Sequence, residues 1–351
     1  MPTPTLYLAM ERELLVVRPQ HGRQVEHRLV GMQTTCLAVD PFRPERVYCG
    51  TFGRGLWRSD DCGDSWQPIG DPGEAMEPPH GAGITHAKIM SVAVSSSQRV
   101  GEYGVVYAGT EPSALFRSDD GGETWRELVN LLKVPSAPTW SFPPRPYTSL
   151  IRWITPDPLV PGRIFVAAEA GALLRSLDGG ETWGDRRPGG PFDSHTVVMH
   201  PLAPDRLYCA AGDGYFESID GGDTWHKPAD GLPFRYLWSV AVDPADPDTV
   251  VVSAAPSAMH AHHLRDNAQA GLYRKVREQP WQRSSAGLPG EIGTVIPIVA
   301  TIHTQPGTFY ALSNRGLFRS TDTGVTWESL DVPWDTAYVT QHQQALVVGE
   351  A

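Results

Sequence analysis

The sequence predicts an all-β protein, a seven-bladed β-propeller whose blades are four-stranded antiparallel sheets. Two observations predict it: a recurring eight-residue motif, and runs of strand length that are rich in β-branched and aromatic residues around each copy. The motif is S-x-D-x-G-x-[ST]-W, and its copies begin at Ser59, Ser118, Ser176, Ser218 and Ser320. A unit that returns every roughly 40–60 residues indicates a repeat architecture. Tandem four-stranded antiparallel units are typical of propeller blades.

The strands of one repeat follow in a fixed order. The first is an apolar run that ends in a turn, as in TTCLAVDPFRPER and HTVVMHPLAPDR, and the second follows at once, as in RVYCGT and RLYCAA. The third precedes the motif, as in GLWRS, and the fourth begins at the motif Trp. A sixth copy, from Gly271 to Trp281, keeps the third strand and the Trp but lacks the Asp and Gly. The one candidate helix, Trp125–Lys133, is short.

The two ends of the chain supply the seventh blade. Residues 6–10, 13–17 and 24–30 match the second, third and fourth strands. The first strand is then predicted at Ala337–Thr340, with Ala345–Val348 as an extra strand or an extension. We therefore expect one domain over 1–351, its seventh blade shared between about 1–31 and 334–351, because pairing the ends removes an open sheet edge. Six blades with loose ends is the alternative.

The composition of the chain argues against some classes of partner and location. The 351 residues include 35 Gly and 32 Pro, which suits many short strands joined by turns. A net charge of −11 argues against nucleic acid or an anionic membrane as a partner. There is no apolar run of about 18 residues to span a bilayer, and no basic leader at the N-terminus. The four cysteines lack metal-site spacing, so we expect reduced thiols and a cytoplasmic protein.

The repeated motif resembles the Asp-box (BNR) repeat, which occurs in sialidases, sortilin-type receptors, some β-glucan hydrolases, a photosystem assembly factor and many uncharacterised bacterial propellers. The resemblance implies the propeller fold and no particular reaction. The physics of the motif is that of a turn: Asp178 accepts backbone N–H groups, Gly180 takes a positive φ, and Trp183 packs on the blade. One site rarely needs five copies on five blades, so we interpret the motif as scaffold.

The long insertions are expected at the end of the propeller opposite the motif turns. They span 69–89, 129–147 and 254–270. Insertions gathered on one face usually mark the binding face of a repeat protein. We therefore expect a small molecule, a glycan or a protein to bind there.

Aligning the blades shows which side chains share a position. The residue after the second strand is Glu11, Phe52, Glu111, Glu169, Gly212 (followed by Asp213), Ala255 and Asn314. Near the start of the innermost strand stand Thr35, Met90, Arg152, His195, Trp238 and Ile298. Two classes of function remain open. The first, which we favour because no complete catalytic motif exists, is a soluble intracellular binding or scaffold protein. The second is a hydrolase or lyase, glycosidase-like or metal-assisted.

The candidate residues follow from these alignments. Paired carboxylates suit glycoside cleavage, and a His/carboxylate set suits a divalent metal. The catalytic candidates are Glu111, Glu169, Arg152 and His195. The ligand-binding candidates are Glu11, Arg54, Tyr147, Asp213, Trp238 and Arg315. The candidate ligands of a divalent metal, the one cofactor that the pattern suggests, are His86, His195, Glu111 and Glu169.

Two further patterns are weak. His260, His262 and His263 cluster on an insertion, but H-x-H-H there is a poor metal signature. Sialidases need three converging arginines and a Tyr/Glu pair. Arg54, Arg152 and Arg315 could converge and Tyr147 could pair with Glu111, but nothing in the sequence fixes that geometry, so we expect no sialidase activity.

Overall fold

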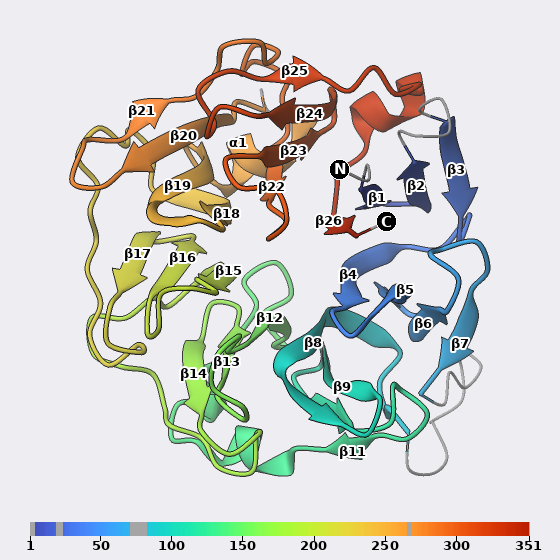
Figure 1. Cartoon of the computed structure of the whole chain (residues 1–351). Helices are drawn as coiled ribbons and strands as arrows, with labels where there is room; N and C mark the ends of the chain where they lie inside the picture. The colour runs from blue at the N-terminus through green and yellow to red at the C-terminus, as the bar shows by residue number, and fades with distance from the viewer. Residues whose placement is uncertain (1–3, 19–23, 71–82, 265–267, 351) are drawn as a thin grey trace.

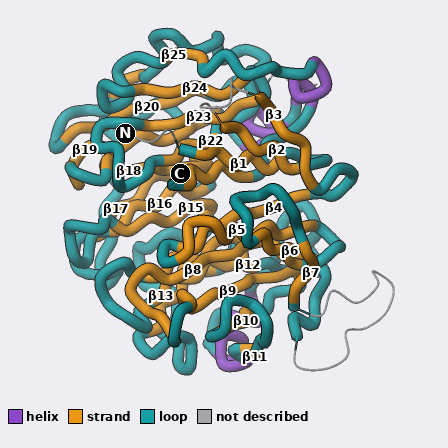
Figure 2. Tube along the Cα trace, turned by 45° about the vertical axis from the view of Figure 1, so that its right-hand side comes forward, coloured by secondary structure: helices purple, strands orange, loops and turns teal. Residues whose placement is uncertain are grey.

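Seven antiparallel sheets form a ring (Figure 1). The innermost strands of the ring line a central channel. The structure is a computed structural model and describes residues 4–18, 24–70, 83–264 and 268–350. The predicted seven-bladed propeller is confirmed. In a view turned by 45°, strands and loops make up most of the chain and the helical pieces are few and short (Figure 2). In these ranges no helix reaches the length and apolarity needed to cross a bilayer.

Each blade runs outward from an innermost strand. The innermost strands are β4 (Thr34–Asp40), β8 (Lys88–Val100), β12 (Ile151–Pro156), β15 (Ser194–Met199), β18 (Tyr236–Asp243), β22 (Ile298–Ala300) and β26 (Ala345–Gly349). The second strands are β5 (Arg43–Thr51), β9 (Tyr103–Glu111), β13 (Ile164–Ala168), β16 (Leu207–Ala211), β19 (Asp246–Ala255), β23 (Phe309–Ser313) and β1 (Thr5–Ala9). Their fully buried aromatic and aliphatic side chains form the core of each blade.

The outer strands are shorter. The third strands are β6 (Leu56–Ser59), β10 (Leu115–Ser118), β14 (Ala172–Ser176), β17 (Gly214–Ser218), β20 (Gly271–Val276), β24 (Gly316–Ser320) and β2 (Leu14–Arg18). The fourth strands are β7 (Gln67–Ile69), β11 (Arg126–Glu127), β21 (Gln282–Arg283), β25 (Glu328–Ser329) and β3 (Gln24–Arg28). In the blades of β12 and β15 the fourth strand is reduced to the bridges Arg175–Gly184 and Glu217–His226.

Helical segments occur only in connections, as far as the structure describes the chain. They are the 3-10 helices η2 (Val129–Lys133), η3 (Ala137–Thr139) and η5 (Thr336–Thr340) and the single-turn helix α1 (Ala258–His262). The candidate helix at Trp125–Lys133 is therefore a short β11 followed by η2.

The ring closes through β26, which pairs with β1 and places the two chain ends side by side (Figure 1). The prediction of the first strand at Ala337–Thr340 is wrong, because those residues form η5, which begins where the Asp335 carboxylate accepts the N–H of Ala337. The segment offered as an extra strand, Ala345–Val348, is the innermost strand. Its Leu346 and Val348 pack with the core around β1.

The motif turns and the turns after the innermost strands share one end of the ring, as predicted. In the blade of β12 the N–H of Gly179 donates to the carbonyl of Gly162 at 2.7 Å, and in the next blade Gly221 donates to Asp205 at 2.9 Å. The residues that follow the second strands lie at the other end of the channel. All four cysteines are free.

Candidate active site at the channel mouth

Five consecutive innermost strands carry a β-bulge at the same height. The pairing register shifts at residues 34–36 of β4, 89–91 of β8, 151–153 of β12, 194–196 of β15 and 237–240 of β18. A bulge leaves one residue out of the ladder and redirects its side chain. The displaced residues are those that the sequence alignment placed together: Thr35, Met90, Arg152, His195 and Trp238.

Two carboxyl groups converge on one of these residues. The Nε2 of His195 lies 3.9 Å from Glu169 Oε1 and 3.7 Å from Asp193 Oδ2. Glu169 follows β13 and is 8% exposed, whereas Asp193 immediately precedes β15. One ligand atom from each of the three residues lies within 4.8 Å of the others, and among the described residues this is the one His/Cys/Asp/Glu group with such spacing. These three residues, with Arg152, Tyr236 and Trp238, are called the mouth cluster below.

His195 has a fixed tautomer. Its Nδ1 lies 2.5 Å from the carbonyl oxygen of Leu237, which only accepts, so Nδ1 carries the proton and donates it. Burial lowers the pKa of His195 to about 3, although the Leu237 carbonyl favours the charged form. The ring is therefore neutral and turns the Nε2 lone pair toward the two carboxyl groups.

The two carboxyl groups have different surroundings. Burial raises the pKa of Glu169 to about 7, because the nearby Arg152 offsets only part of the desolvation. Burial also raises the pKa of Asp193, but the N–H of Ala170 donates to its Oδ1 at 2.9 Å and favours the ionised form. The Asp193 side chain is 28% exposed, so it is the more accessible of the two.

Arg152 and two aromatic rings complete the mouth cluster. The guanidinium of Arg152 lies over the Trp238 ring at 4.3 Å from its centroid, and its Nε is 3.8 Å from Glu169 Oε2. That distance is too long for a hydrogen bond, and the buried Nε has no hydrogen-bond partner. Tyr236 and Trp238 are stacked at 17° with centroids 6.5 Å apart.

A histidine pair covers the aromatic side of the cluster. His262 comes from α1 and His342 from the segment before β26, and their Nδ1 and Nε2 atoms are hydrogen-bonded to each other. The Tyr236 hydroxyl lies 2.7 Å from His262 Nε2, and the His262 ring meets Trp238 edge to face. Burial lowers the pKa of His342 to about 4 and that of His262 well below its usual value. The 254–270 insertion thus reaches the channel mouth through a neutral His262.

Glu111 differs from Glu169 and Asp193 in its hydrogen-bond partners. Its Oε1 accepts from Arg145 at 3.0 Å and from Lys88 at 3.2 Å. Burial would raise the pKa of Glu111, but these hydrogen bonds outweigh it and lower the pKa below its usual value. Arg145 belongs to the 129–147 insertion and Lys88 to the end of 69–89, of which residues 71–82 lie outside the described ranges. Glu111 therefore anchors insertions.

The other predicted residues lie outside the cluster. Of the four predicted metal ligands the structure groups only Glu169 and His195, since His86 packs 6.1 Å from the Phe116 ring and Glu111 is held by Arg145 and Lys88. Arg54, Arg315 and Tyr147 are exposed, so Arg54 and Arg315 do not form a buried carboxylate site with Arg152. Asp213 contacts the backbone N–H of Asp193 at 3.5 Å, and Glu11 is half-buried on its own blade.

Sequence reasoning missed Asp193, Tyr236, His262 and His342. A signal existed for two of them: Asp193 stands two residues before His195, and Tyr236 two before Trp238, so each shares a face of its strand with its partner. His262 and His342 are 80 residues apart and no repeat relates them, so no pattern connects them.

Residues 116–127, which include the second copy of the motif, match the BNR/Asp-box repeat. The chain is a β-propeller that contains a BNR/Asp-box repeat. A xyloglucanase from Paenibacillus sp is 32% identical to this Asp-box propeller over 131 residues, which are 35% of this chain and 11% of the xyloglucanase. The chain thus spans about a tenth of the length of that relative.

Solved structures share the fold of this Asp-box propeller. The GH74 enzyme of Niastella koreensis has a TM-score of 0.67 at 16% identity, over 93% of this chain and 52% of that one. YCF48 from Cyanidioschyzon merolae has a TM-score of 0.55 at 13% identity, over 88% of this chain and 87% of that one. At these identities the likeness concerns the fold alone.

Proposed function

We propose that this Asp-box propeller is a hydrolase of glycosidic bonds, with its reacting groups in the mouth cluster. The observation that carries the proposal is the convergence of Glu169 and Asp193 on His195 at the end of the channel that bears the insertions. A glycosidase needs two carboxyl groups, one on each side of the scissile bond. The similarity to a xyloglucanase over 131 residues supports hydrolysis over binding alone.

The different surroundings suggest the two roles. Glu169 is the more buried carboxyl group and retains a proton near neutral pH, as a general acid requires. Asp193 is more exposed and accepts a backbone N–H, as suits an ionised nucleophile. Trp238 beside them is partly exposed and lines the channel.

The spacing favours retention of configuration. One oxygen of each carboxyl group lies within 4.8 Å of the other, well short of the roughly 6.5–9.5 Å between the carboxyl groups of inverting glycosidases. Asp193 would bond to the anomeric carbon while the bond to the leaving oxygen breaks and Glu169 gives that oxygen its proton. Water would then bond to the anomeric carbon, lose a proton to Glu169 and release Asp193.

The test is hydrolysis of xyloglucan and a panel of aryl glycosides by the wild type, E169Q, D193N and the control E11Q. Glu11 occupies the position equivalent to Glu169 in another blade. We expect D193N to lower kcat/KM by roughly 10²–10⁴-fold on every substrate. E169Q should do so for poor leaving groups and far less for dinitrophenyl glycosides, which leave without a proton. Absence of wild-type turnover across the panel, or an effect of E11Q equal to that of D193N, would contradict the proposal.

A metal-assisted hydrolase is the second candidate, and one observation favours it. The neutral His195 presents a lone pair to two carboxyl oxygens at 3.7 and 3.9 Å, with its tautomer set by a backbone carbonyl, as metal-binding histidines usually have it. A divalent cation there would bind and acidify water. Metal analysis after dialysis against Mn²⁺ or Zn²⁺ distinguishes the two candidates. The metal-assisted mechanism would replace the acid–base mechanism if the wild type binds one ion per chain, H195A and D193N bind none, and turnover requires the ion.

A further inference from the structure

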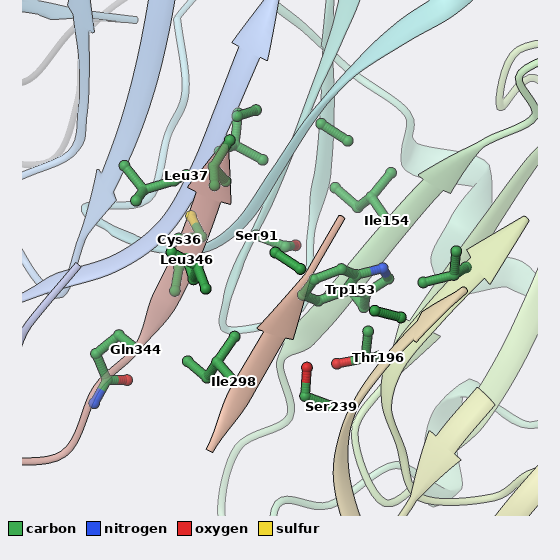
Figure 3. A pocket seen from close by; sticks show the side chains of 18 of the residues that line it. Cys36, Leu37, Ser91, Trp153, Ile154, Thr196, Ser239, Ile298, Gln344 and Leu346 are labelled. Carbon is green, nitrogen blue, oxygen red and sulfur yellow. The ribbon is translucent and has the colours of Figure 1, made fainter. Parts of the chain in front are cut away.

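The central channel has walls that are mostly apolar. It encloses about 410 Å³ between the innermost strands of the blades. Leu37, Trp153, Ile154, Ile298 and Leu346 surround this space together with small polar residues (Figure 3). Ligand pockets typically enclose about 300–1,000 Å³ and are lined mainly by apolar side chains with a few polar groups.

The hydroxyl groups on the channel wall already donate hydrogen bonds within the protein. Four donate to a backbone carbonyl of the next blade: Thr35 to Ile89 at 2.5 Å, Ser91 to Ile151 at 2.7 Å, Thr196 to Trp238 at 2.8 Å and Ser239 to Val299 at 3.3 Å. The hydroxyl of Thr301 donates to the carbonyl of Val242 in the preceding blade at 3.2 Å. A water molecule in the channel therefore finds few donors among these side chains. Water held so weakly is displaced favourably by an apolar group.

Among the residues that the structure describes along the channel wall, Arg152 is the one with a charged side chain, and it lies at the mouth. Arg152 is 8% exposed and lies over Trp238, which lines the channel as well. Its Nε lacks a hydrogen-bond partner although it is buried. A buried guanidinium N–H without a partner is costly, and an anionic oxygen is the partner that best satisfies it.

We propose that the channel binds a small amphiphile, with an alkyl or aryl chain along the innermost strands and one carboxylate at Arg152. The apolar walls fit the chain, and the unpartnered Nε at the mouth fits the head group. The head group would lie close to Glu169, whose Oε2 is 3.8 Å from the same Nε. Binding is nevertheless measured separately from hydrolysis, because its readout is decanoate affinity and not glycoside turnover.

The test is to titrate the purified protein with decanoate, decanol and acetate. Binding is measured by calorimetry and by the tryptophan fluorescence of the protein, to which Trp153 and Trp238 contribute. We expect decanoate to bind one molecule per chain, decanol more weakly by roughly tenfold or more, and acetate not to saturate. R152Q should reduce decanoate affinity to that of decanol and leave decanol binding unchanged.

Two matched variants locate the ligand. A38M fills the channel, where Ala38 lines the wall, and should weaken decanoate binding by roughly tenfold or more. A229M adds the same side chain at an exposed position and should bind as the wild type does. Thermal unfolding of each variant shows that it is folded. Equal affinity of A38M and wild type, or several decanoate molecules per chain, would overturn the proposal, as would R152Q binding decanoate like the wild type.

Discussion

At the scale of single residues, the motif aspartates hold their turns together with the same bonds in each copy. In one copy the Asp178 carboxylate accepts the N–H of Thr182 at 2.8 Å and its hydroxyl at 2.6 Å, and it also accepts the Ser176 hydroxyl at 2.8 Å. Gly180 has φ +96°, and a Cβ there would lie 2.4 Å from Leu128. The carboxylate therefore accepts hydrogen bonds from groups of the turn that would otherwise have no partner within it.

D178A should lower the free energy of unfolding by about 1 kcal/mol, comparable to the loss of a helix cap. D178N keeps one acceptor oxygen and should cost less than D178A. Urea unfolding of both variants measures the difference. A change in glycoside turnover in D178A without a loss of stability would contradict the interpretation of the motif as scaffold.

The same turns predict a pH dependence of stability. Hydrogen bonds from Thr224 lower the pKa of Asp220 to about 2, and in Asp322 those from Thr326 outweigh burial and lower the pKa to about 2. A carboxyl group with a depressed folded-state pKa stabilises the fold above its ordinary pKa of 3.8 and loses that effect as pH falls toward 2. The separation between the urea midpoints of wild type and the D220N/D322N variant should therefore be full at pH 5 and should narrow as pH falls from 4 to 2. A separation at pH 2 as large as that at pH 5 would argue against these bonds.

At the scale of elements, the insertion 129–147 is tied to the channel end by a buried carboxylate. Arg145 reaches Glu111, which also binds Lys88. Removing one partner of a buried ion pair leaves a charge without compensation. R145A should therefore cost about 2 kcal/mol, less than a fully unpaired charge because Lys88 remains.

A double-mutant cycle separates this pair from general damage to the loop. E111Q/R145A should be less destabilised than the sum of E111Q and R145A, because the double variant removes both charges of the Glu111–Arg145 pair and leaves neither one without the other. Hydrogen exchange should show faster exchange over 129–147 in R145A. Additive effects of the two substitutions would contradict a direct coupling.

The elements also show what a sequence can predict. A repeat predicts the motif and the strands. It also predicts that Arg152, His195 and Trp238 lie at the same level along the channel, because equivalent positions of the repeats occupy equivalent places in their blades. Neither the bulges nor the contact of His262 with His342 follows from it, since each depends on packing between segments far apart in the chain. The same reason explains why η5 was predicted as a strand: an apolar run beside the Asp335 cap suits either structure.

At the scale of the whole molecule, the ring depends on the pairing of β26 with β1. Leu346 is 6% exposed and packs in the cluster that contains Leu6 and Leu8. L346A should cost about 2–4 kcal/mol, and amide exchange should accelerate in β1 and β26 together. L177A, at a 64% exposed site, is the matched control and should change little. Faster exchange in β26 alone would show that the ring does not close cooperatively.

The central claim is that the mouth cluster cleaves glycosidic bonds through Asp193, and covalent trapping tests it most directly. A 2-deoxy-2-fluoro glycoside with a dinitrophenyl leaving group, in the sugar series that the wild type hydrolyses fastest, should add one sugar per chain. Peptide mass spectrometry should then place that sugar on Asp193, with no adduct in D193N. An adduct on another residue, or an equal adduct in D193N, would contradict the account.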